Sequence, residues 1–367
     1  MKCMKASIPL VFVSVVLGHG AALAATGTLN VLNWSDYIGK DTVAQYQQAT
    51  GVKVKYDALD SDDTLQAKLL SGHTGYDVVY PTLTYMANQI EAGVYEKLDW
   101  TKIPNRSNID PELMKKISKM DPGNRYGVPY AWGTEGISIN LKQVGAVLGK
   151  DVDLDALGWN LLFNPAVVSK LSKCGVSIVD SPADVFPIVL SYMGRDPNSK
   201  NVSDYRDAYN VLKKIRPYVT QFSSTYLNDV AGGDVCVAYT WSGDAGMIKR
   251  RVMEAHRDFE IKYLVPKGGG GVWFTMMAIP KDAENKEDAY KWINFILKPD
   301  VSAGITNDTT YPTGNVAARS MINASLVNDT SIYPTSEQVK TYFVLQPIDP
   351  DIRHTINKLW LDFKADR

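Results

Sequence analysis

The chain has 367 residues, which at about 150 residues per domain corresponds to two or three domains or lobes. Apolar residues make up 45% of the sequence and charged residues 22%, and 39 Lys and Arg nearly balance 40 Asp and Glu, for a formal net charge of -1. This is the composition of an ordinary globular protein, and it excludes collagenous, low-complexity and strongly basic nucleic-acid-binding chains.

Residues 1–24 have the pattern of a secretory signal peptide. Lys2 and Lys5 precede an apolar run over 8–17, and small residues ending in Ala22-Leu23-Ala24 follow. The run is too short to cross a bilayer, and the A-x-A pattern predicts a mature chain that begins near residue 25. A buried N-terminal helix is the alternative interpretation.

Strand and helix patterns alternate along the rest of the chain. The predicted strands are 29–32, 52–56, 76–80, 176–179, 235–240 and 272–279. The predicted helices are 42–50, 63–71, 165–173, 204–215, 225–231 and 245–256. This order predicts an α/β fold, with parallel or mixed sheets flanked by helices.

Two extended segments are too long for tight turns and lie where the chain could cross between two lobes. They are 126–140, and 261–266 with the glycine run 268–271 that follows. A strand follows the glycines, whereas a phosphate-binding loop is followed by a helix, so this run is interpreted as a crossing or an exposed turn. Two crossings make each lobe discontinuous, as in proteins that close around ligands by a hinge motion. The predicted division places 25–133 and 261–311 in lobe 1, and 134–260 and 312–367 in lobe 2.

Motifs of known enzymes and metal sites are missing from the sequence. There is no G-x-S-x-G, H-E-x-x-H or Walker sequence, and the four His are scattered. Asp60, Asp62 and Asp63 lack the Gly and the terminal Glu of a calcium loop, and Ser61 and Asp62 directly precede a predicted helix, which favours helix capping. We therefore expect no catalytic residue, no cofactor and no metal.

Three cysteines are present, and Cys3 lies within the predicted signal peptide, before its apolar run rather than after it, where a lipid anchor would be attached. We therefore expect a freely soluble exported protein. Cys174 and Cys236 remain as an even pair in an oxidising compartment, which favours a disulfide over two buried thiols.

Aromatic side chains stand next to small polar and acidic residues at the ends of predicted strands. The four clusters are Trp34-Ser35-Asp36-Tyr37, Trp241-Ser242-Gly243-Asp244, Trp273-Phe274-Thr275 and Thr310-Tyr311-Pro312. Ligands of α/β sheets bind outside the carboxyl ends of the strands. Aromatic faces with a carboxylate form a cage for an alkyl ammonium, because the rings attract the cation and pack against its methylene stem. Each aromatic taken alone is equally consistent with ordinary packing.

Six segments, spread over nearly the whole mature chain, resemble one known family. They are NWSDYI at 33–38, TGVKVKYD at 50–57, TGYDVVYP at 74–81, ELMKKISKMDPGNRYGVPYAWGTEGI at 112–137, KCGVSIVDSPADVF at 173–186 and NDVAGGDVCVAYTWSGDAG at 228–246. In this order they resemble the periplasmic polyamine (putrescine/spermidine)-binding proteins of ABC importers. The resemblance implies the type II periplasmic binding protein fold, with two discontinuous α/β lobes, a hinge and a ligand cleft between them. It also implies a membrane permease as partner, no catalysis, and a disulfide between Cys174 and Cys236.

Carried over residue by residue, the resemblance implies a set of ligand-binding residues. The family's cleft aromatics fall on Trp34, Tyr37, Trp241, Trp273 and Tyr311, and its polar contacts fall on Ser35, Asp36, Thr82, Asp184 and Ser223. Its main amine-binding carboxylate falls on Asp244. Thr82 stands where relatives often have Ser, Trp273 where they often have Phe, and Asp184 where they often have the longer Glu.

Thr275 is the main departure from the family pattern. In putrescine-binding relatives this position is acidic and acts together with the carboxylate at the position of Asp244. Because a hydroxyl removes one negative charge, a shared ammonium is expected to bind roughly 10- to 150-fold more weakly. The departure bears on which amine is bound.

We therefore expect a periplasmic solute-binding protein that captures a small aliphatic amine, a polyamine such as putrescine or spermidine, and delivers it to the permease subunits of an ABC importer. The expected ligand is held by Asp244 and Asp184, stacked on Trp34, Trp241 and Trp273, and sealed by Tyr37 and Tyr311. The protein is expected to be a monomer that binds no nucleic acid. Three alternatives stay open: a binder of an ω-amino acid or monoamine, which the neutral Thr275 would tolerate; an amine sensor or scaffold; and a secreted enzyme that acts on an amine.

Overall fold

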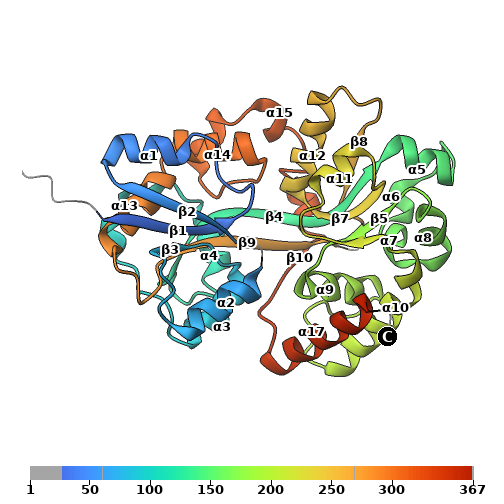
Figure 1. Ribbon diagram of the computed structural model, residues 1–367, viewed down its shortest axis with the longest axis horizontal. Helices are drawn as coiled ribbons and strands as arrows, with labels where there is room; N and C mark the ends of the chain where they lie inside the picture. The colour runs from blue at the N-terminus through green and yellow to red at the C-terminus, as the bar shows by residue number, and fades with distance from the viewer. Residues whose placement is uncertain (1–26, 60, 268, 366–367) are drawn as a thin grey trace, which may run out of the picture.

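The structure is a computed structural model that describes residues 27–59, 61–267 and 269–365. Ten strands of these residues form one extended sheet, and helices cover it in two halves that meet at the middle of the molecule (Figure 1). The predicted signal peptide, residues 1–24, lies outside the described residues. Within them, no helix is both long enough and apolar enough to cross a membrane.

The first half contains the N-terminal strands and the helices around them. Its strands are β1 (Thr28–Trp34), β2 (Lys53–Leu59), β3 (Val78–Val79) and β9 (Gly271–Ala278). Its helices are α1 (Thr42–Thr50), α2 (Asp62–Ser71), α3 (Leu83–Glu91), η1 (Trp100–Lys102), η2 (Pro104–Asn108), α4 (Pro111–Ile117), α13 (Lys286–Ile296) and α14 (Pro299–Thr309). β1 pairs in parallel with β2 and β3, and β3 pairs antiparallel with β9.

The second half repeats this architecture with a shorter sheet. Its strands are β5 (Val176–Ile178), β6 (Gln221–Phe222), β7 (Val237–Trp241) and β8 (Ile261–Leu264). Its helices are α5 (Leu141–Leu148), α6 (Leu154–Leu157), α7 (Asn160–Phe163), α8 (Pro165–Leu171), α9 (Pro182–Tyr192), α10 (Val202–Ile215), η3 (Arg216–Tyr218), α11 (Leu227–Gly232), α12 (Ser242–Glu254) and α17 (Pro350–Lys364). β5 pairs in parallel with both β6 and β7, so their carboxyl ends lie at one edge.

Strand β4 (Gly127–Asn140) runs through both halves. Residues 127–134 pair antiparallel with β9, and residues 135–140 pair antiparallel with β7 and β8. The strand is buried along almost its whole length. It therefore follows the path expected for a segment that crosses between lobes.

The other two connections lie later in the chain than the sequence analysis placed them. The boundary expected at Ile261 assigns β8 to lobe 1, but β8 pairs with the second part of β4, so the chain crosses back after Leu264. The boundary expected at Tyr311 is also early, because Ala318 and Ile322 pack on Ala303 of α14 in the first half. The physical reason is the same in both cases. A short element, β8 in the first case and η4 in the second, pairs or packs with the half that the chain is about to leave. The two-lobe division stays a proposal, with these limits moved.

The last connection runs from the first half to helix α17. It contains η4 (Val316–Met321), α15 (Ala324–Val327), α16 (Ser336–Val339) and the short strand β10 (Phe343–Val344), which pairs in parallel with the start of β9. α17 then packs on α9 and α10 of the second half. Three stretches of chain thus join the halves.

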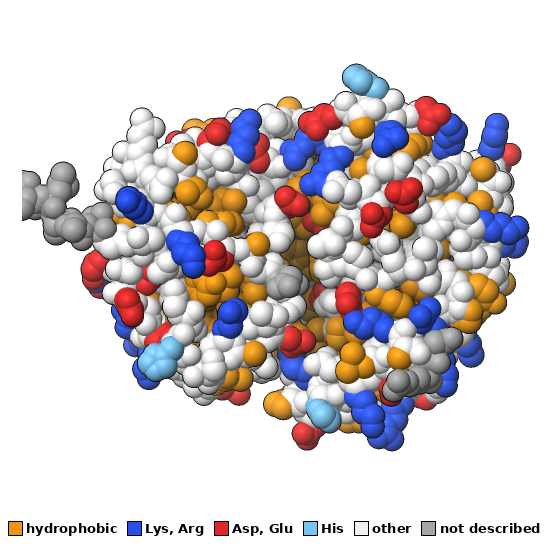
Figure 2. Space-filling model, in the orientation of Figure 1, with side chains coloured by type: hydrophobic (Ala, Val, Ile, Leu, Met, Phe, Trp, Pro, Cys, Tyr) orange, Lys and Arg blue, Asp and Glu red, His pale blue; other side chains and the backbone are white. Residues whose placement is uncertain are grey.

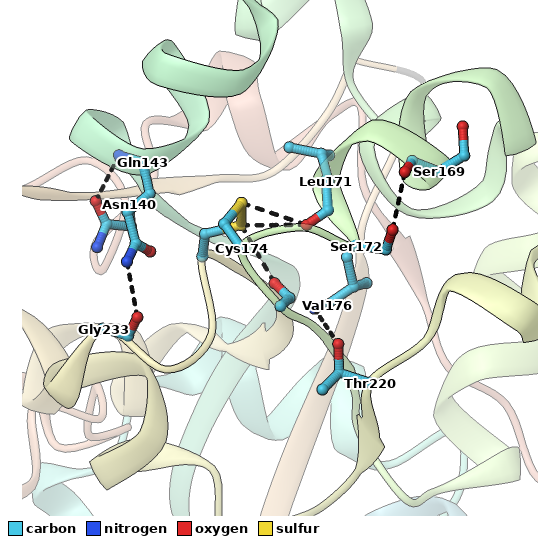
Figure 3. Close-up of a disulfide and its surroundings, with 11 residues drawn as sticks. Asn140, Gln143, Ser169, Leu171, Ser172, Cys174, Val176, Thr220 and Gly233 are labelled. Carbon is cyan, nitrogen blue, oxygen red and sulfur yellow. Dashed lines mark hydrogen bonds between the residues drawn. A yellow bond between two sulfur atoms is a disulfide. The ribbon is translucent and has the colours of Figure 1, made fainter.

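A disulfide links Cys174, which follows α8, to Cys236, which precedes β7, and their Cα atoms are 5.5 Å apart (Figure 3). The predicted pairing is confirmed. Backbone bonds hold both sides of the link: Cys236 N–H donates to the Gly175 carbonyl at 3.0 Å, and Asn140 N–H donates to the Cys236 carbonyl at 2.8 Å. Closing a loop of 62 residues stabilises the fold by about 4 kcal/mol in the chain-entropy model.

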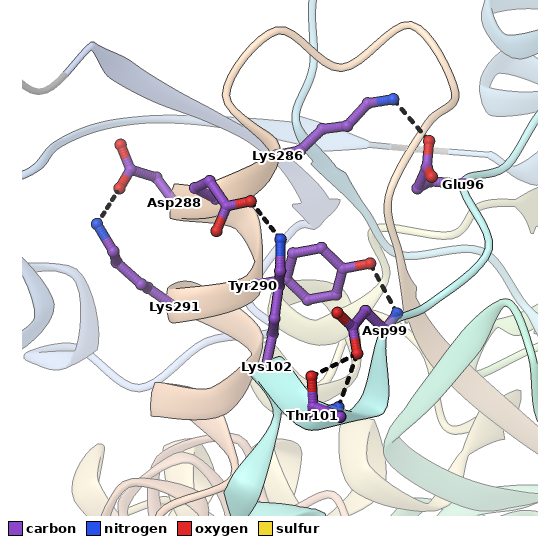
Figure 4. Close-up of polar contacts among 9 residues, drawn as sticks. Glu96, Asp99, Thr101, Lys102, Lys286, Asp288, Tyr290 and Lys291 are labelled. Carbon is purple, nitrogen blue, oxygen red and sulfur yellow. Dashed lines mark hydrogen bonds and ion pairs between the residues drawn. The ribbon is translucent and has the colours of Figure 1, made fainter.

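A network of polar contacts joins α13 to the segment that contains η1 (Figure 4). Lys286 pairs with Glu96 at 2.6 Å, Lys102 pairs with Glu287, and the backbone N–H of Asp99 donates to the Tyr290 hydroxyl at 2.9 Å. Exposed ion pairs each contribute at most about 1 kcal/mol, so the network mainly orients the segment against the helix.

Candidate functional site

Most of the predicted ligand-binding residues lie where the two halves meet, and Ser223 is the exception. From the second half come the carboxyl ends of β5 and β7, each followed by the first turn of a helix, α9 or α12. From the first half come the turn after β1, the start of β9 and the turn after α14. Figure 2 shows a narrow groove between the halves, with acidic side chains along its rim, basic side chains at its upper end and apolar side chains deeper inside.

Asp244 is buried at the centre of this arrangement, in the first turn of α12, with 6% of its surface exposed. The Tyr311 hydroxyl donates to its Oδ1 at 2.5 Å, and the Tyr226 hydroxyl donates to its Oδ2 at 2.7 Å. No Lys or Arg of the described chain forms an ion pair with it. Burial raises the pKa of Asp244 to about 6, although the two phenol hydrogen bonds act to lower it. The charge of Arg251, which pairs with Asp36, also acts to lower this pKa, but Arg251 forms no ion pair with Asp244. The site therefore holds a carboxylate that two neutral donors orient and that has no direct ion-pair partner in the described chain.

Three aromatic rings pack edge to face beside Asp244. The Tyr311 ring lies 4.6 Å from the Tyr37 ring and 5.5 Å from the Trp273 ring, between centroids. The three residues come from separate parts of the chain, and all are buried. The indole N–H of Trp273 has no hydrogen-bond acceptor among the described residues. The rings thus form an apolar wall next to the carboxylate, with one unused donor in it.

Gly243 allows this close packing. A Cβ built on Gly243 would lie 2.3 Å from Cγ of Tyr311, well inside contact distance, so any larger residue would displace the ring. Because Gly243 belongs to the second half and Tyr311 follows α14 of the first, the contact lies across the junction of the halves.

Thr275 lies on the first-half side of the cluster, with 2% of its surface exposed. Its Oγ1 is 3.3 Å from the Tyr37 hydroxyl, and its backbone forms an isolated bridge with Thr82. The Thr82 hydroxyl donates to Oδ2 of Asp62 at 2.5 Å, and its backbone N–H donates to Oδ1 at 3.1 Å. Burial raises the pKa of Asp62 to about 7, and the Asp184 carboxylate adds to this effect. The expected capping of α2 is confirmed for Ser61, whose Oγ accepts from Thr64 N at 3.1 Å.

The end of β1 and the turn after it contribute one partly buried and two exposed residues beside Tyr37. The indole N–H of Trp34 donates to the Tyr80 carbonyl at 2.9 Å. Ser35 and Asp36 are exposed, and Asp36 has a positive φ of 53°. The Asp36 carboxylate pairs with Arg251 of α12 at 3.5 Å, an ion pair that bridges the two halves.

The remaining predicted residues lie at the edge of the second-half sheet. The Trp241 ring centroid is 6.2 Å from that of Tyr226. Asp184 is partly buried in the first turn of α9, and burial raises its pKa to about 6. Ser223 follows β6, and its N–H donates to the Ile178 carbonyl at 3.1 Å. The contacts of the described residues do not join Ser223 to the other predicted ligand residues.

Sequence reasoning missed several residues of this site. Tyr226, which binds Asp244, is fully buried and precedes α11, and nothing in its local sequence distinguishes it from a core residue. The sequence pattern assigns Asp62 to helix capping, but its carboxylate accepts two bonds from Thr82. Glu135 lies outside the contacts described above, but it carries a sequence signal of its own, since it is the one charged residue in the 14-residue strand β4.

The arrangement is suited to binding a cation with an apolar stem. A buried carboxylate supplies the charge, and aromatic faces supply the packing surface. Among the described residues, no group of three or more His, Cys, Asp or Glu is placed to hold a metal ion.

Comparison with known proteins identifies the family of this chain and its relatives. Residues 41–331 match the model of a family described as bacterial extracellular solute-binding protein. The chain is 43% identical over 350 residues to a putrescine-binding periplasmic protein of Pseudomonas aeruginosa, covering 95% of each protein. It is 41% identical to a putrescine-binding periplasmic protein of Escherichia coli, covering 95% of this chain and 94% of that protein.

Solved structures agree with the sequence comparison. A putative spermidine/putrescine ABC transporter protein from Listeria monocytogenes superposes with a TM-score of 0.83 at 29% identity, covering 93% of this chain and 99% of the other. A spermidine/putrescine ABC transporter substrate-binding protein from Streptococcus pneumoniae superposes with a TM-score of 0.74 at 27% identity, covering 93% and 99%.

Proposed function

The chain belongs to the family of bacterial extracellular solute-binding proteins, and from this premise we propose that it captures a small aliphatic amine in the periplasm and delivers it to an ABC importer. The similar proteins named above are periplasmic binders of putrescine or parts of spermidine/putrescine transporters, which supports both the ligand class and the compartment. The proposal includes no chemical step.

The observation that carries the proposal is the state of Asp244. An ionised carboxylate that is 6% exposed is costly unless it is paired, and its two partners in the chain are neutral phenols. An ammonium is the group that completes such a site, because it supplies the missing charge and up to three donors. The rings of Tyr37, Tyr311 and Trp273 provide the wall for its methylene stem.

A second candidate ligand is an ω-amino acid, and two features of β9 favour it. Thr275 brings no negative charge to the cluster, and the buried Trp273 N–H lacks an acceptor. The two residues are two positions apart on one strand, so their side chains share a face. A ligand carboxylate at that face would accept from the indole and would not meet the second acid that putrescine-binding relatives carry at position 275.

Asp244→Asn tests the proposed function. Titration calorimetry of the native protein with putrescine, spermidine, n-butylamine and 4-aminobutyrate identifies the amines that bind. Asp244→Asn is expected to weaken the binding free energy of each amine by roughly 2 to 5 kcal/mol, because the ammonium loses its buried partner.

The matched control is Asp300→Asn, which makes the same change at an exposed aspartate and is expected to leave every affinity unchanged. An unaltered Kd in the Asp244→Asn variant would remove Asp244 from the site, and with it the basis of the proposal. Loss of amine uptake on deletion of the gene would separate transport from a purely sensory role.

A further inference from the structure

Glu135 is a buried carboxyl group that the proposed function does not yet use. It is the one charged side chain of β4 and has 0% of its surface exposed, and the groups that act on its carboxyl group are the Asp184 carboxyl, the Tyr239 hydroxyl and the Gly271 backbone, none of which is a cation. These neutral or acidic neighbours do not balance a negative charge, so a cation that reached Glu135 would stabilise its ionised form.

The position of Glu135 in the fold places it at the ligand-binding edge. It lies directly opposite Trp241 in the antiparallel pairing of β4 with β7. Directly paired residues point to the same face of a sheet, so Glu135 and Trp241 share one face. Trp241 ends β7, and Asp244 follows it within one turn of α12. The Glu135 carboxyl thus lies at the same sheet edge as the proposed ammonium site.

Asp184 and Gly271 surround the Glu135 side chain. A Cβ built on Gly271 would lie 2.1 Å from Oε2 of Glu135, so the absence of a side chain there makes room for the carboxyl group. Burial raises the pKa of Glu135 well above its ordinary value, and the Asp184 carboxylate beside it raises the pKa further. Two acids from β4 and α9 therefore face each other across the edge of the sheet.

No cation of the described chain forms an ion pair with either acid. Arg353 of α17, whose charge acts on the nearby Asp62, stacks instead on the Tyr85 ring, with its Cζ 3.8 Å from the ring centroid. Glu135 and Asp184 therefore have no cation as a direct partner. Asp244 likewise has none, since its two partners are phenol hydroxyls.

We propose that Glu135 is a further ligand-binding residue of this chain: it joins Asp184, which the family resemblance already assigns to the site, in holding the second ammonium of a dication or polycation whose first ammonium meets Asp244. The inference rests on the proposed function, because it assumes that the first ammonium meets Asp244. A monoamine would leave Glu135 and Asp184 without a cation, and an ω-amino acid would add a further acid to the pair if its carboxylate lay there.

The test compares putrescine with n-butylamine, which has the same four-carbon stem and lacks the second ammonium. Calorimetry of the native protein is expected to show tighter binding of putrescine. Glu135→Gln keeps the shape of the side chain but cannot ionise, and it is expected to weaken the affinity for putrescine and for spermidine roughly 10- to 150-fold, the range for one charged hydrogen bond. The affinity for n-butylamine is expected to stay within about threefold, because that ligand makes no contact with residue 135.

Three controls make the result specific. Glu112→Gln, the same change at an exposed position of α4, is expected to change neither affinity. Glu135→Met, which fills a similar volume without polar atoms, is measured in parallel to provide a folded neutral variant. The thermal unfolding midpoint of each ligand-free variant reports its folding.

The outcomes separate this inference from the proposed function. If Glu135→Gln and Glu135→Met leave the putrescine affinity unchanged, or weaken both amines equally, Glu135 does not bind a second ammonium. If Asp244→Asn still weakens both amines in that case, the proposed function stands without the inference. If the native protein binds none of the three amines, the proposed function itself is overturned.

Discussion

Asp244 binds two phenol hydroxyls and no cation, and its raised pKa of about 6 sets the pH range in which it can attract one. Above this range the carboxyl group is ionised, and below it the group is protonated and neutral. Aliphatic ammonium groups remain charged throughout, since their pKa lies near 10. Asp184, with its pKa also raised to about 6, titrates over the same range.

We expect amine affinity to fall as the pH is lowered from 7.5 to 5, by up to about tenfold per pH unit below the pKa of Asp244. The ligand-free protein should respond in the opposite direction. The pKa of Asp244 is higher in the folded chain than the ordinary value of 3.8, so its ionisation destabilises the fold, and the unfolding free energy should fall as the pH rises from about 4 to about 6. Calorimetry and chemical denaturation at matched pH values check both trends. An amine affinity that does not vary with pH would show that neither acid binds the ligand.

Thr275 separates the two candidate ligands. Thr275→Asp adds a carboxylate on the same face of β9 as Trp273, next to the Tyr37 hydroxyl. It is expected to strengthen putrescine binding by up to the strength of one charged hydrogen bond, less the repulsion between the new acid and Asp244 in the empty site. It should weaken 4-aminobutyrate if that ligand places its carboxylate near residue 275.

Titrations of both ligands against the native and Thr275→Asp proteins therefore have expected changes of opposite sign. Thr275→Val, which removes the hydroxyl without adding charge, is the control. If the affinities for both ligands change in the same direction, position 275 does not determine selectivity. The end of the site that contains Glu135 and Asp184 would then be tested next.

At the scale of elements, the first turn of α12 positions Asp244 and its contact with Tyr311. The helix starts at Ser242, directly after Trp241 ends β7, with no loop between them. This brings Asp244 to the carboxyl end of the strand and presses Gly243 against the Tyr311 ring. The sequence pattern predicts a later start for this helix, at residue 245, because Gly243 weakens a helical pattern.

Gly243→Ala tests the importance of that contact. The added methyl group must displace Tyr311, so the hydrogen bond from Tyr311 to Asp244 is lost and amine affinity is expected to fall about tenfold or more. Gly304→Ala is the matched control: Gly304 is exposed within α14, and a Cβ added there would have no neighbouring atom within 4 Å. That variant should keep native affinity and gain about 0.5 to 1 kcal/mol of stability. Native affinity in Gly243→Ala would mean that Tyr311 does not help to bind the ligand.

The sequence predicted elements well where local patterns decide the structure. The helix over 42–50 has the expected bounds, since Gly51 adopts a positive φ of 73° and ends it. The strand expected over 76–80 is reduced to Val78–Val79, because its length depends on pairing with β1 and β9 rather than on its own residues. Tyr226 and Glu135 show the same limit for the site: their roles depend on partners far along the chain.

For the whole molecule, the type II periplasmic binding protein fold expected from the sequence is confirmed by the structural comparisons. The alternation of strand and helix patterns along the sequence predicted an α/β fold, and the extended segments indicated crossings between two halves. The residues at which the chain crosses between the halves could not be read from the sequence. The segments that end at Leu264 and Ile322 belong to one half or the other because of pairing and packing with distant residues.

The course of β4 also governs how this protein folds. Its first residues pair with β9, roughly 150 residues later in the chain, and its last residues pair with β7, roughly 100 residues later. Because this one continuous strand pairs in both halves, the second half lacks a pairing strand until β8 is made, and the first half lacks one until β9 and β10 are made. The two halves are therefore not autonomous folding units: early contacts in either of them remain provisional, native pairing has a high contact order, and folding of this chain is expected to be slow and cooperative.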